Sequence, residues 1–249
     1  MLSASKLVMR CTLLILLLGC SFQLQAAEKL KPEEIIKRFA AKETEFRAEW
    51  EKYTYNQRIL FEVLDRSDRV QERREMWVRV FFTTDGERQI EVVEDQGEIY
   101  SVGVTREDLE DAIHRQPFVM TSQDLPNYKI KYKGTEGVDE LDTYVFEVRP
   151  DKKKKGERYF QGRIWVDSVD FQIVMTQGKI VPDYGNNKFP EFETVREQID
   201  GKFWFPTWTQ GDIDLRGRGP GGRSRRVHVR ELITYQDFEK YEVTTSIEF

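Results

Sequence analysis

Apolar and polar residues alternate along most of the chain after Tyr53, and this period of two is the pattern of β-strands with two different faces. The clearest case is the segment 158–179, in which two apolar runs flank the polar turn 167–170. We expect a β-hairpin there. The residues expected to share a face are Phe160, Ile164 and Val166 in the first run, and Phe171, Ile173 and Met175 in the second.

Similar runs recur along the rest of the sequence and predict roughly ten or eleven strands, so we expect a mainly β chain. Pro206 interrupts one of these runs. Because proline cannot donate a hydrogen bond to a neighbouring strand, it favours an edge strand or a bulge at this position. No linker rich in Pro and Ser divides the strands, and residues 27–249 are therefore predicted to form a single domain.

Two segments have helical periodicity instead. In residues 31–50 apolar side chains recur at helical spacing with charged residues between them, which is typical of an amphipathic helix. A second, short helix is expected over 105–115, where Thr105 followed by Asp108 resembles a capping box with Asp in place of the usual Glu or Gln. A loop with several apolar residues continues to Pro126. We expect the short helix and this loop to form a lid or a plug.

Residues 1–26 have the pattern of an export signal that is removed from the mature protein. Lys6 and Arg10 supply the positive start, and the unbroken apolar run 13–18 is too short to span a bilayer. Two processing routes remain open at its end. Signal peptidase could cut before Ala27, or the segment 17–20 could act as a bacterial lipobox.

In the second route Cys20 would be lipidated and would anchor the protein to the outer membrane. Both routes predict a mature protein outside the cytoplasm. Both cysteines of the chain, Cys11 and Cys20, lie within the signal. The mature chain is therefore expected to have no disulfide, no thiol nucleophile and no thiolate metal site.

Charge and short motifs narrow the range of possible functions further. The formal net charge of −5 gives no reason to expect nucleic-acid binding. The segment 217–222 matches GxGxxG, but strand periodicity follows it instead of the helix that a dinucleotide site needs. Asp212 and Asp214 resemble the start of a calcium loop whose later ligand positions hold arginine.

The only two histidines, His114 and His228, do not belong to a cluster with ligand spacing. Catalytic residues, cofactors and metal ligands are therefore not predicted, and we do not expect an enzyme. Two basic loops, 152–155 and 216–226, are interpreted as solvated hairpin tips. The alternative is contact with anionic lipid headgroups or an acidic partner, which gains support if both loops lie at the same end of the sheet.

Three phrases carry a resemblance to a known superfamily: GRIWVDSVDFQIV at 162–174, FWFPTWT at 203–209 and ITYQDFEKY at 233–241. With the order of signal, helix, strands, short helical insertion and further strands, most of residues 30–249 resembles the LolA/LolB-type periplasmic half-barrel. This superfamily includes RseB-like sensors and outer-membrane lipoprotein-sorting proteins. The resemblance implies an unclosed antiparallel half-barrel, covered by the N-terminal helix and the short helical lid, whose concave face binds acyl chains.

The first functional hypothesis is therefore a non-enzymatic envelope protein that binds acyl chains of lipids or lipoproteins in a hydrophobic cavity, with a membrane surface or a membrane protein as a further partner. The second is a periplasmic sensor or scaffold with a filled core that binds a protein partner. The residues expected to line the cavity are Phe39, Phe46, Leu109, Ile113, Tyr128, Ile130, Tyr132, Tyr144, Phe146, Ile164 and Ile173.

Overall fold

The computed structural model describes residues 30–83, 87–182, 189, 191–218 and 224–240. The predicted export signal with Cys20 lies outside them, as do residues 219–222 of the GxGxxG segment. The chain divides into two compact units, Met1–Leu30 and Lys31–Phe249, and every element below belongs to the second. No helix in the described part of the chain is long and apolar enough to cross a membrane.

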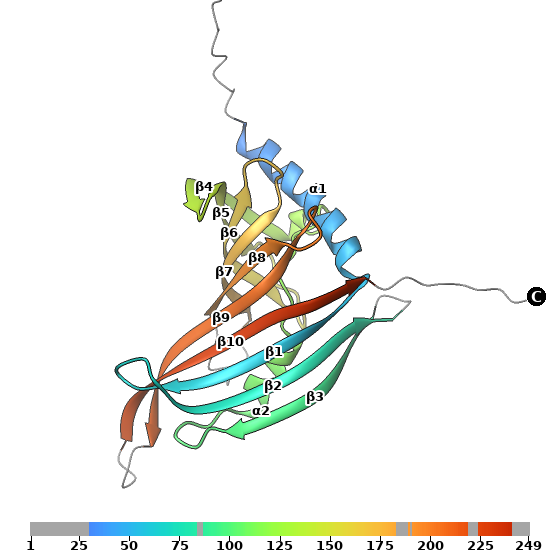
Figure 1. Ribbon diagram of the computed structural model, residues 1–249. Helices are drawn as coiled ribbons and strands as arrows, with labels where there is room; N and C mark the ends of the chain where they lie inside the picture. The colour runs from blue at the N-terminus through green and yellow to red at the C-terminus, as the bar shows by residue number, and fades with distance from the viewer. Residues whose placement is uncertain (1–29, 84–86, 183–188, 190, 219–223, 241–249) are drawn as a thin grey trace, which may run out of the picture. The chain divides into compact units, whose positions relative to one another are not determined.

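Ten strands form one antiparallel sheet, in the order β3-β2-β1-β10-β9-β8-β7-β6-β5-β4 (Figure 1). β3 and β4 are its two open edges, so the sheet is not closed into a barrel. The predicted fold class, a mainly β protein with an unclosed sheet and a few helices, is confirmed. The elements are α1 (Pro32–Trp50), β1 (Tyr53–Leu64), β2 (Val70–Phe82), β3 (Arg88–Glu98), α2 (Arg106–His114), the 3₁₀ turn η1 (Leu125–Asn127), β4 (Tyr128–Val138), β5 (Leu141–Pro150), β6 (Tyr159–Asp167), β7 (Ile173–Val181), β8 (Glu191–Gln198), β9 (Trp204–Arg218) and β10 (Ser224–Lys240).

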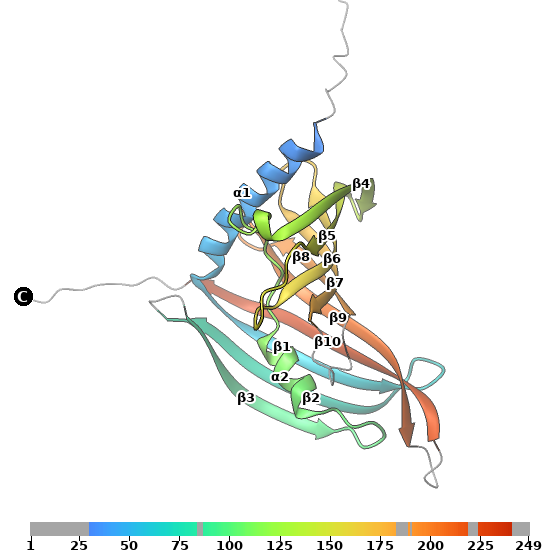
Figure 2. The ribbon, with the colours of Figure 1, turned by 180° about the vertical axis from the view of Figure 1, so that it is seen from behind.

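The connection between the two edges of the sheet is a single segment of the chain. Residues 99–127, which we call the strap, follow β3 and lead into β4. Because these strands lie at opposite edges, the strap has to cross one face of the sheet, and α2 within it lies beside β1 (Figure 2). We call this face the inner face and the other the outer face.

The helix α1 covers the inner face with one apolar stripe. Pro32 stands in its first turn, and Phe39, Phe46 and Trp50 along the stripe are almost completely buried. Phe39 packs on the ring of Phe146 from β5, with 5.5 Å between ring centroids. Burying an aromatic side chain of this size stabilises the fold by about 1.5–3 kcal/mol. The helix predicted over 31–50 is confirmed.

The short helix α2 begins at the capping box that the sequence predicts. The side-chain oxygen of Thr105 accepts from the backbone N–H of Asp108, and the Asp108 carboxylate accepts from the backbone N–H of Thr105. Aspartate therefore fills the position that Glu or Gln usually takes in this motif.

The hairpin of β6 and β7 differs from its prediction in one respect. A β-bulge between the pairs Trp165–Met175 and Val166–Ile173 shifts the register by one residue. Because consecutive residues of β6 point to opposite faces, Ile173 and Met175 end on opposite faces. The expectation that they share a face is wrong, since period-two counting cannot anticipate an extra residue.

Two further features of the sheet involve glycine and proline. Gly162 and Gly178 are cross-strand partners, and a Cβ on either would lie within 2.4 Å of a carbonyl oxygen of the neighbouring strand. Only glycine permits this close approach of two backbones. Pro206 lies where the register between β8 and β9 shifts, so it marks a bulge inside the sheet and not an edge strand.

Candidate functional site: the inner face and its strap

The residues predicted to line a cavity lie on the inner face or on the elements that cover it, and they fall into two groups by burial. Those with no exposed surface are Phe39, Phe46, Phe146, Ile164 and Ile173. Those that are partly exposed are Leu109, Ile113, Tyr128, Ile130, Tyr132 and Tyr144.

The structure brings some of these residues together and separates others. Tyr132 packs on Phe146, with ring centroids 5.4 Å apart, and on Tyr144 at 6.5 Å. Together with Phe39 they form an aromatic cluster beneath α1. Leu109 and Ile113 of α2 instead pack with Phe46 against β1, β2 and β10. The predicted set therefore lines two neighbouring regions of one inner face.

The strap places an aromatic ring between these regions. Phe118, which follows α2 and lies outside regular secondary structure, stacks on Phe160 of β6 with ring centroids 4.3 Å apart and an interplanar angle of 23°. The same ring meets Tyr128 edge-on at 6.0 Å. Phe160 is 2% exposed, so the slot that receives Phe118 belongs to the core of the half-barrel.

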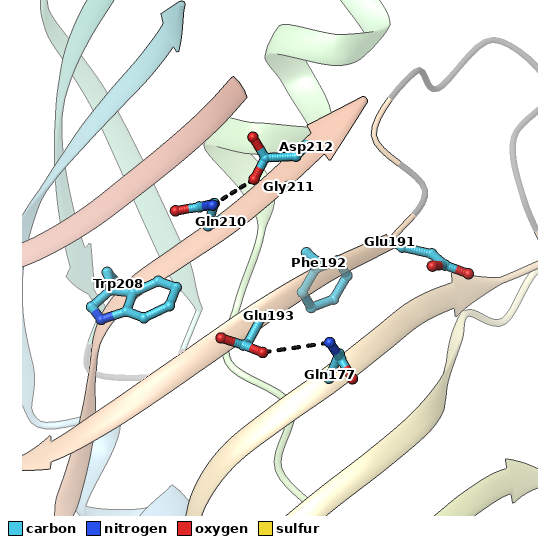
Figure 3. Close-up of a pocket in the computed structure, with 8 residues that line it drawn as sticks. All are labelled: Gln177, Glu191, Phe192, Glu193, Trp208, Gln210, Gly211 and Asp212. Atoms are coloured by element: carbon cyan, nitrogen blue, oxygen red, sulfur yellow. Dashed lines mark hydrogen bonds between the residues drawn. The ribbon is translucent and has the colours of Figure 1, made fainter. Parts of the chain in front are cut away.

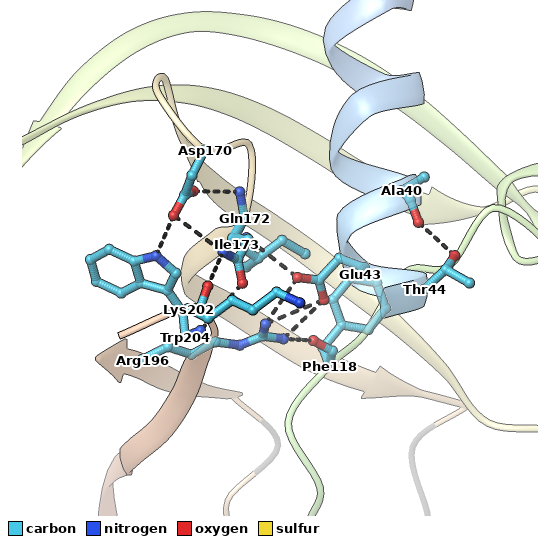
Figure 4. A network of polar contacts seen from close by, with 10 residues as sticks. All are labelled: Ala40, Glu43, Thr44, Phe118, Asp170, Gln172, Ile173, Arg196, Lys202 and Trp204. Carbon is cyan, nitrogen blue, oxygen red and sulfur yellow. Dashed lines mark hydrogen bonds and ion pairs between the residues drawn. The ribbon is translucent and has the colours of Figure 1, made fainter. Parts of the chain in front are cut away.

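A buried ion pair clamps this part of the strap (Figure 4). Glu43 of α1 and Arg196 of β8 are 3.0 Å apart at their closest atoms, with side chains 0% and 1% exposed. Arg196 also donates to the backbone carbonyl of Phe118, and the backbone N–H groups of Met120 and Ile173 donate to Glu43. Burial raises the pKa of Glu43, an effect that the Arg196 guanidinium opposes.

A second ion pair lies at the end of α2. Arg115 donates to Glu231 of β10 and to Asp111 of α2, in both cases at 2.6 Å. Burial would lower the pKa of Arg115, but the carboxylates of Glu231 and Asp111 outweigh it and raise that pKa. Asp111 in turn binds Arg158, which is exposed. This network therefore connects the interior with solvent.

Three side chains of the sheet donate hydrogen bonds to main-chain carbonyls of the strap. Arg196 bonds the carbonyl of Phe118, Gln57 bonds that of Arg115 at 3.5 Å, and Arg88 bonds that of Ile113 at 3.1 Å. Bonds to the backbone hold the strap irrespective of its side chains, and each is worth only about 0.5–1.5 kcal/mol net, or 1.5–3 when the donor is charged. The strap is therefore held by several separable contacts.

Sequence reasoning missed these polar residues because charged residues on a predicted surface are normally solvated. A signal was nevertheless present. Glu43 interrupts the apolar stripe of α1 between Phe39 and Phe46, and Glu231 interrupts the alternation between Val229 and Ile233. A polar residue at a position that the periodicity assigns to the core predicts a buried partner.

The outer face carries two neighbouring grooves. One, of about 260 Å³, lies over β7, β8 and β9 and is lined by Trp208 and the carboxylates of Glu191, Glu193 and Asp212 (Figure 3). Burial raises the pKa of Glu193, whose carboxylate accepts a hydrogen bond from Gln177. The other groove, of about 610 Å³, lies over β5, β6 and β7 and is basic.

The two histidines have different surroundings. His114 ends α2 and is exposed. His228 lies on the outer face between Asp212 and Asp214, at 2.9 and 3.3 Å. Arginines complete this partly exposed set of ion pairs, which gives it the character of a solvated surface network. Within the described residues, no group of three His, Cys, Asp or Glu side chains could hold a metal ion.

The ten-stranded unclosed sheet with its covering helix has the architecture that the resemblance in the sequence implies. No family model matches the chain. No curated protein matches it either.

Among solved structures, the chain is similar to a DUF1329 family protein from Desulfovibrio piger, with 14% identity over 87% of this chain and 96% of that one, and a TM-score of 0.46. It is also similar to an outer membrane lipoprotein-sorting protein domain from Vibrio parahaemolyticus, with 13% identity, 86% and 95% coverage and a TM-score of 0.40. A third is a LolA superfamily protein from Nitrosomonas europaea, with 12% identity, 82% and 94% coverage and a TM-score of 0.38. At these identities the likeness concerns the fold alone.

Proposed function

We propose that the protein is a non-enzymatic binding protein of the periplasm that takes up an acyl chain of a lipid or lipoprotein on the inner face of its half-barrel when the strap moves aside. The observation that carries this proposal is the position of Phe118. Its ring comes from a segment without regular structure and occupies an aromatic slot of the core between Phe160 and Tyr128. An acyl chain would occupy the same slot in place of this ring.

The free energy gained by burying an acyl chain is comparable with the free energy needed to release the strap. An acyl chain gains about 0.8 kcal/mol for each CH₂ group removed from water, so eight buried methylenes contribute roughly 6 kcal/mol. Releasing the strap exposes Phe118 and breaks the bonds that the strap accepts from Arg196, Gln57 and Arg88, at a cost of roughly 5–10 kcal/mol. The ligand therefore offsets much of the cost of moving the strap, and the sheet need not unfold.

A second function is favoured by a different observation, namely that the inner face is already filled. Phe39, Phe146 and Ile164 have no exposed surface, and the ion pair Glu43–Arg196 is buried as well. A half-barrel that stays closed would act as a sensor or scaffold that binds a protein partner on its outside.

A cross-link between strap and sheet separates the two functions. Phe118→Cys with Phe160→Cys, joined by a cleavable bis-maleimide in a Cys20→Ser background, fixes the strap in its closed position. We expect the joined protein to lose binding of a fluorescent fatty acid and to lose co-purified acyl chains in mass spectrometry. Cleavage of the reagent should restore both, which controls for the loss of the two rings.

The matched control is Lys129→Cys with Arg149→Cys, register partners that are exposed on the outer face of β4 and β5, whereas the strap crosses the inner face. Joining them should leave fatty-acid binding unchanged. Equal binding by the closed and cleaved strap variants would show that the acyl site is not the inner face. A wild type that never binds acyl chains, but retains a protein partner in both states, would establish the closed scaffold.

A further inference from the structure

The outer face of β4–β7 concentrates positive charge in an otherwise acidic protein. The chain has a formal net charge of −5. Register places Lys131, Glu147 and Arg163 in one cross-strand row, and Lys129 beside Arg149 in the next. Residues two apart on a strand share a face. We call the resulting set the basic face; its members are Lys129, Lys131, Lys133, Arg149, Arg163 and Lys179.

The carboxylates on this face are already bonded to some of its cations. Glu147 forms ion pairs with both Arg149 and Lys133, the latter at 3.4 Å, and Asp151 forms one with Lys129. The Arg149 guanidinium holds the pKa of Glu147 below its usual range, so this carboxylate stays ionised and remains paired with Arg149. Arg163 and Lys131 form no ion pair with any described residue. Both are exposed, and their charge faces solvent.

A groove runs through the basic face. It has a volume of about 610 Å³ and is lined by Arg149, Arg163 and Lys179, with the backbones of Gly162 and Gly178 in its wall. The carboxylate of Glu147 also lines the groove, where it is bonded to Arg149. The carboxylate of Glu191 marks its border toward the acidic groove over β8.

The neighbouring hairpin tip extends the same charge. Residues 152–155 are four lysines, all exposed, between β5 and β6. Antiparallel pairing puts this tip at the same end of the sheet as the last residues of β9 and the first of β10, where Arg216 and Arg226 lie. The arrangement that favours contact of the basic loops with lipid headgroups is therefore present.

We propose that the basic face docks on an anionic membrane surface, with lipid phosphates bound in the groove beside Arg163. The absence of apolar anchors favours a lipid surface over a protein partner. Protein interfaces usually have an apolar or aromatic centre, whereas the exposed large apolar side chains of the described residues lie outside β4–β7, on β2, β3 and in loops. A headgroup layer attracts basic residues without needing such a centre. This docking does not depend on acyl-chain binding.

Vesicle flotation tests the proposal. The exported chain with Cys20→Ser, which carries no acyl anchor, is mixed with vesicles of phosphatidylcholine containing 30% phosphatidylglycerol, or of phosphatidylcholine alone. We expect binding to the anionic vesicles only, and its loss in 0.5 M NaCl. Lys131→Glu with Arg163→Glu should lower the partition coefficient at least about tenfold.

The matched control is Lys37→Glu with Arg79→Glu, which changes the net charge equally at exposed positions on α1 and β2; it should bind anionic vesicles within about threefold of wild type. A second variant, Lys152→Glu with Lys153→Glu, alters only the hairpin tip and should weaken binding even if the first variant is poorly folded. Equal binding to neutral vesicles, equal loss in the control, or capture of an acidic protein without vesicle binding would each overturn the proposal.

Discussion

The two buried ion pairs hold the same strap but differ in how completely their carboxylates are hydrogen-bonded. Both carboxylate oxygens of Glu43 are bonded to Arg196, and the pair has almost no exposed surface. In the other pair only one oxygen of Glu231 is bonded to Arg115; the second has no partner among the described residues. The carboxylate with more bonds costs more to release, although the Nε of Arg196 itself has no partner among the described residues. We therefore expect the strap to open from α2 and to remain anchored longest at Phe118.

The largest effect is expected from breaking the pair between α1 and β8. Arg196→Met leaves the carboxylate of Glu43 buried without a counter-charge, which costs about 3–5 kcal/mol of the free energy of unfolding. Replacing both residues with methionine removes the uncompensated charge. The double variant should be more stable than the single variant, as measured by urea denaturation. A double variant that loses as much as the sum of the two single variants would contradict a buried, mutually compensated pair.

A smaller effect is expected at the second pair. Glu231→Gln keeps the shape of the side chain, and Arg115 retains Asp111 as a counter-charge, so the global stability should fall by only about 1–2 kcal/mol. Amide hydrogen exchange should quicken in α2 and little elsewhere, since local opening needs less energy than unfolding of the sheet. Glu43→Gln is the matched variant and should quicken exchange around Met120. Equal quickening of α2 in both variants would show that the strap opens as one unit.

How far the sequence predicts this arrangement depends on the range of each interaction. The helices, the strand pattern and the capping box at Thr105 follow from neighbouring residues, and all were predictable. The ion pairs join residues 153 and 116 positions apart, and periodicity contains no information about which polar residue meets which. The bulge at the pair Trp165–Met175 was unpredictable for another reason, because an extra residue inverts every face assignment after it.

The smallest effect is expected from changing the pH, which acts on Asp111 at the end of the second network that reaches solvent. Burial opposes ionisation of Asp111, but Arg115 and Arg158 prevail and hold its pKa below the ordinary value of 3.8. A group whose pKa is lower in the folded state contributes stability above its unfolded pKa and loses it as the pH falls through the folded pKa. Protection of α2 attributable to Asp111 should therefore be constant between pH 7 and about 5 and decline below about 4.

Asp111→Asn isolates this contribution, because the difference in exchange rate between it and wild type should shrink as the pH falls below 4. Arg106→Gln is a suitable control on α2, since its partner Glu110 is exposed and lies at the surface. A difference between Asp111→Asn and wild type that stays constant down to pH 3 would show that the carboxylate does not anchor the strap.

The pairing of β1 with β10 determines the order in which the sheet can be assembled. Tyr53 lies opposite Lys240 and Leu64 opposite His228, so the middle of the sheet joins segments from the two ends of the described chain. The hairpins β1–β2–β3 and the run β4–β9 involve nearby residues and can form early, whereas the central pair requires closure of a very long loop. During synthesis β10 is made after all the other strands. The sheet therefore cannot be completed before β10 is present, which would keep a chain that is exported in an unfolded state from folding too early. Until β10 pairs with β1, the strap also lacks its ion pair with Glu231.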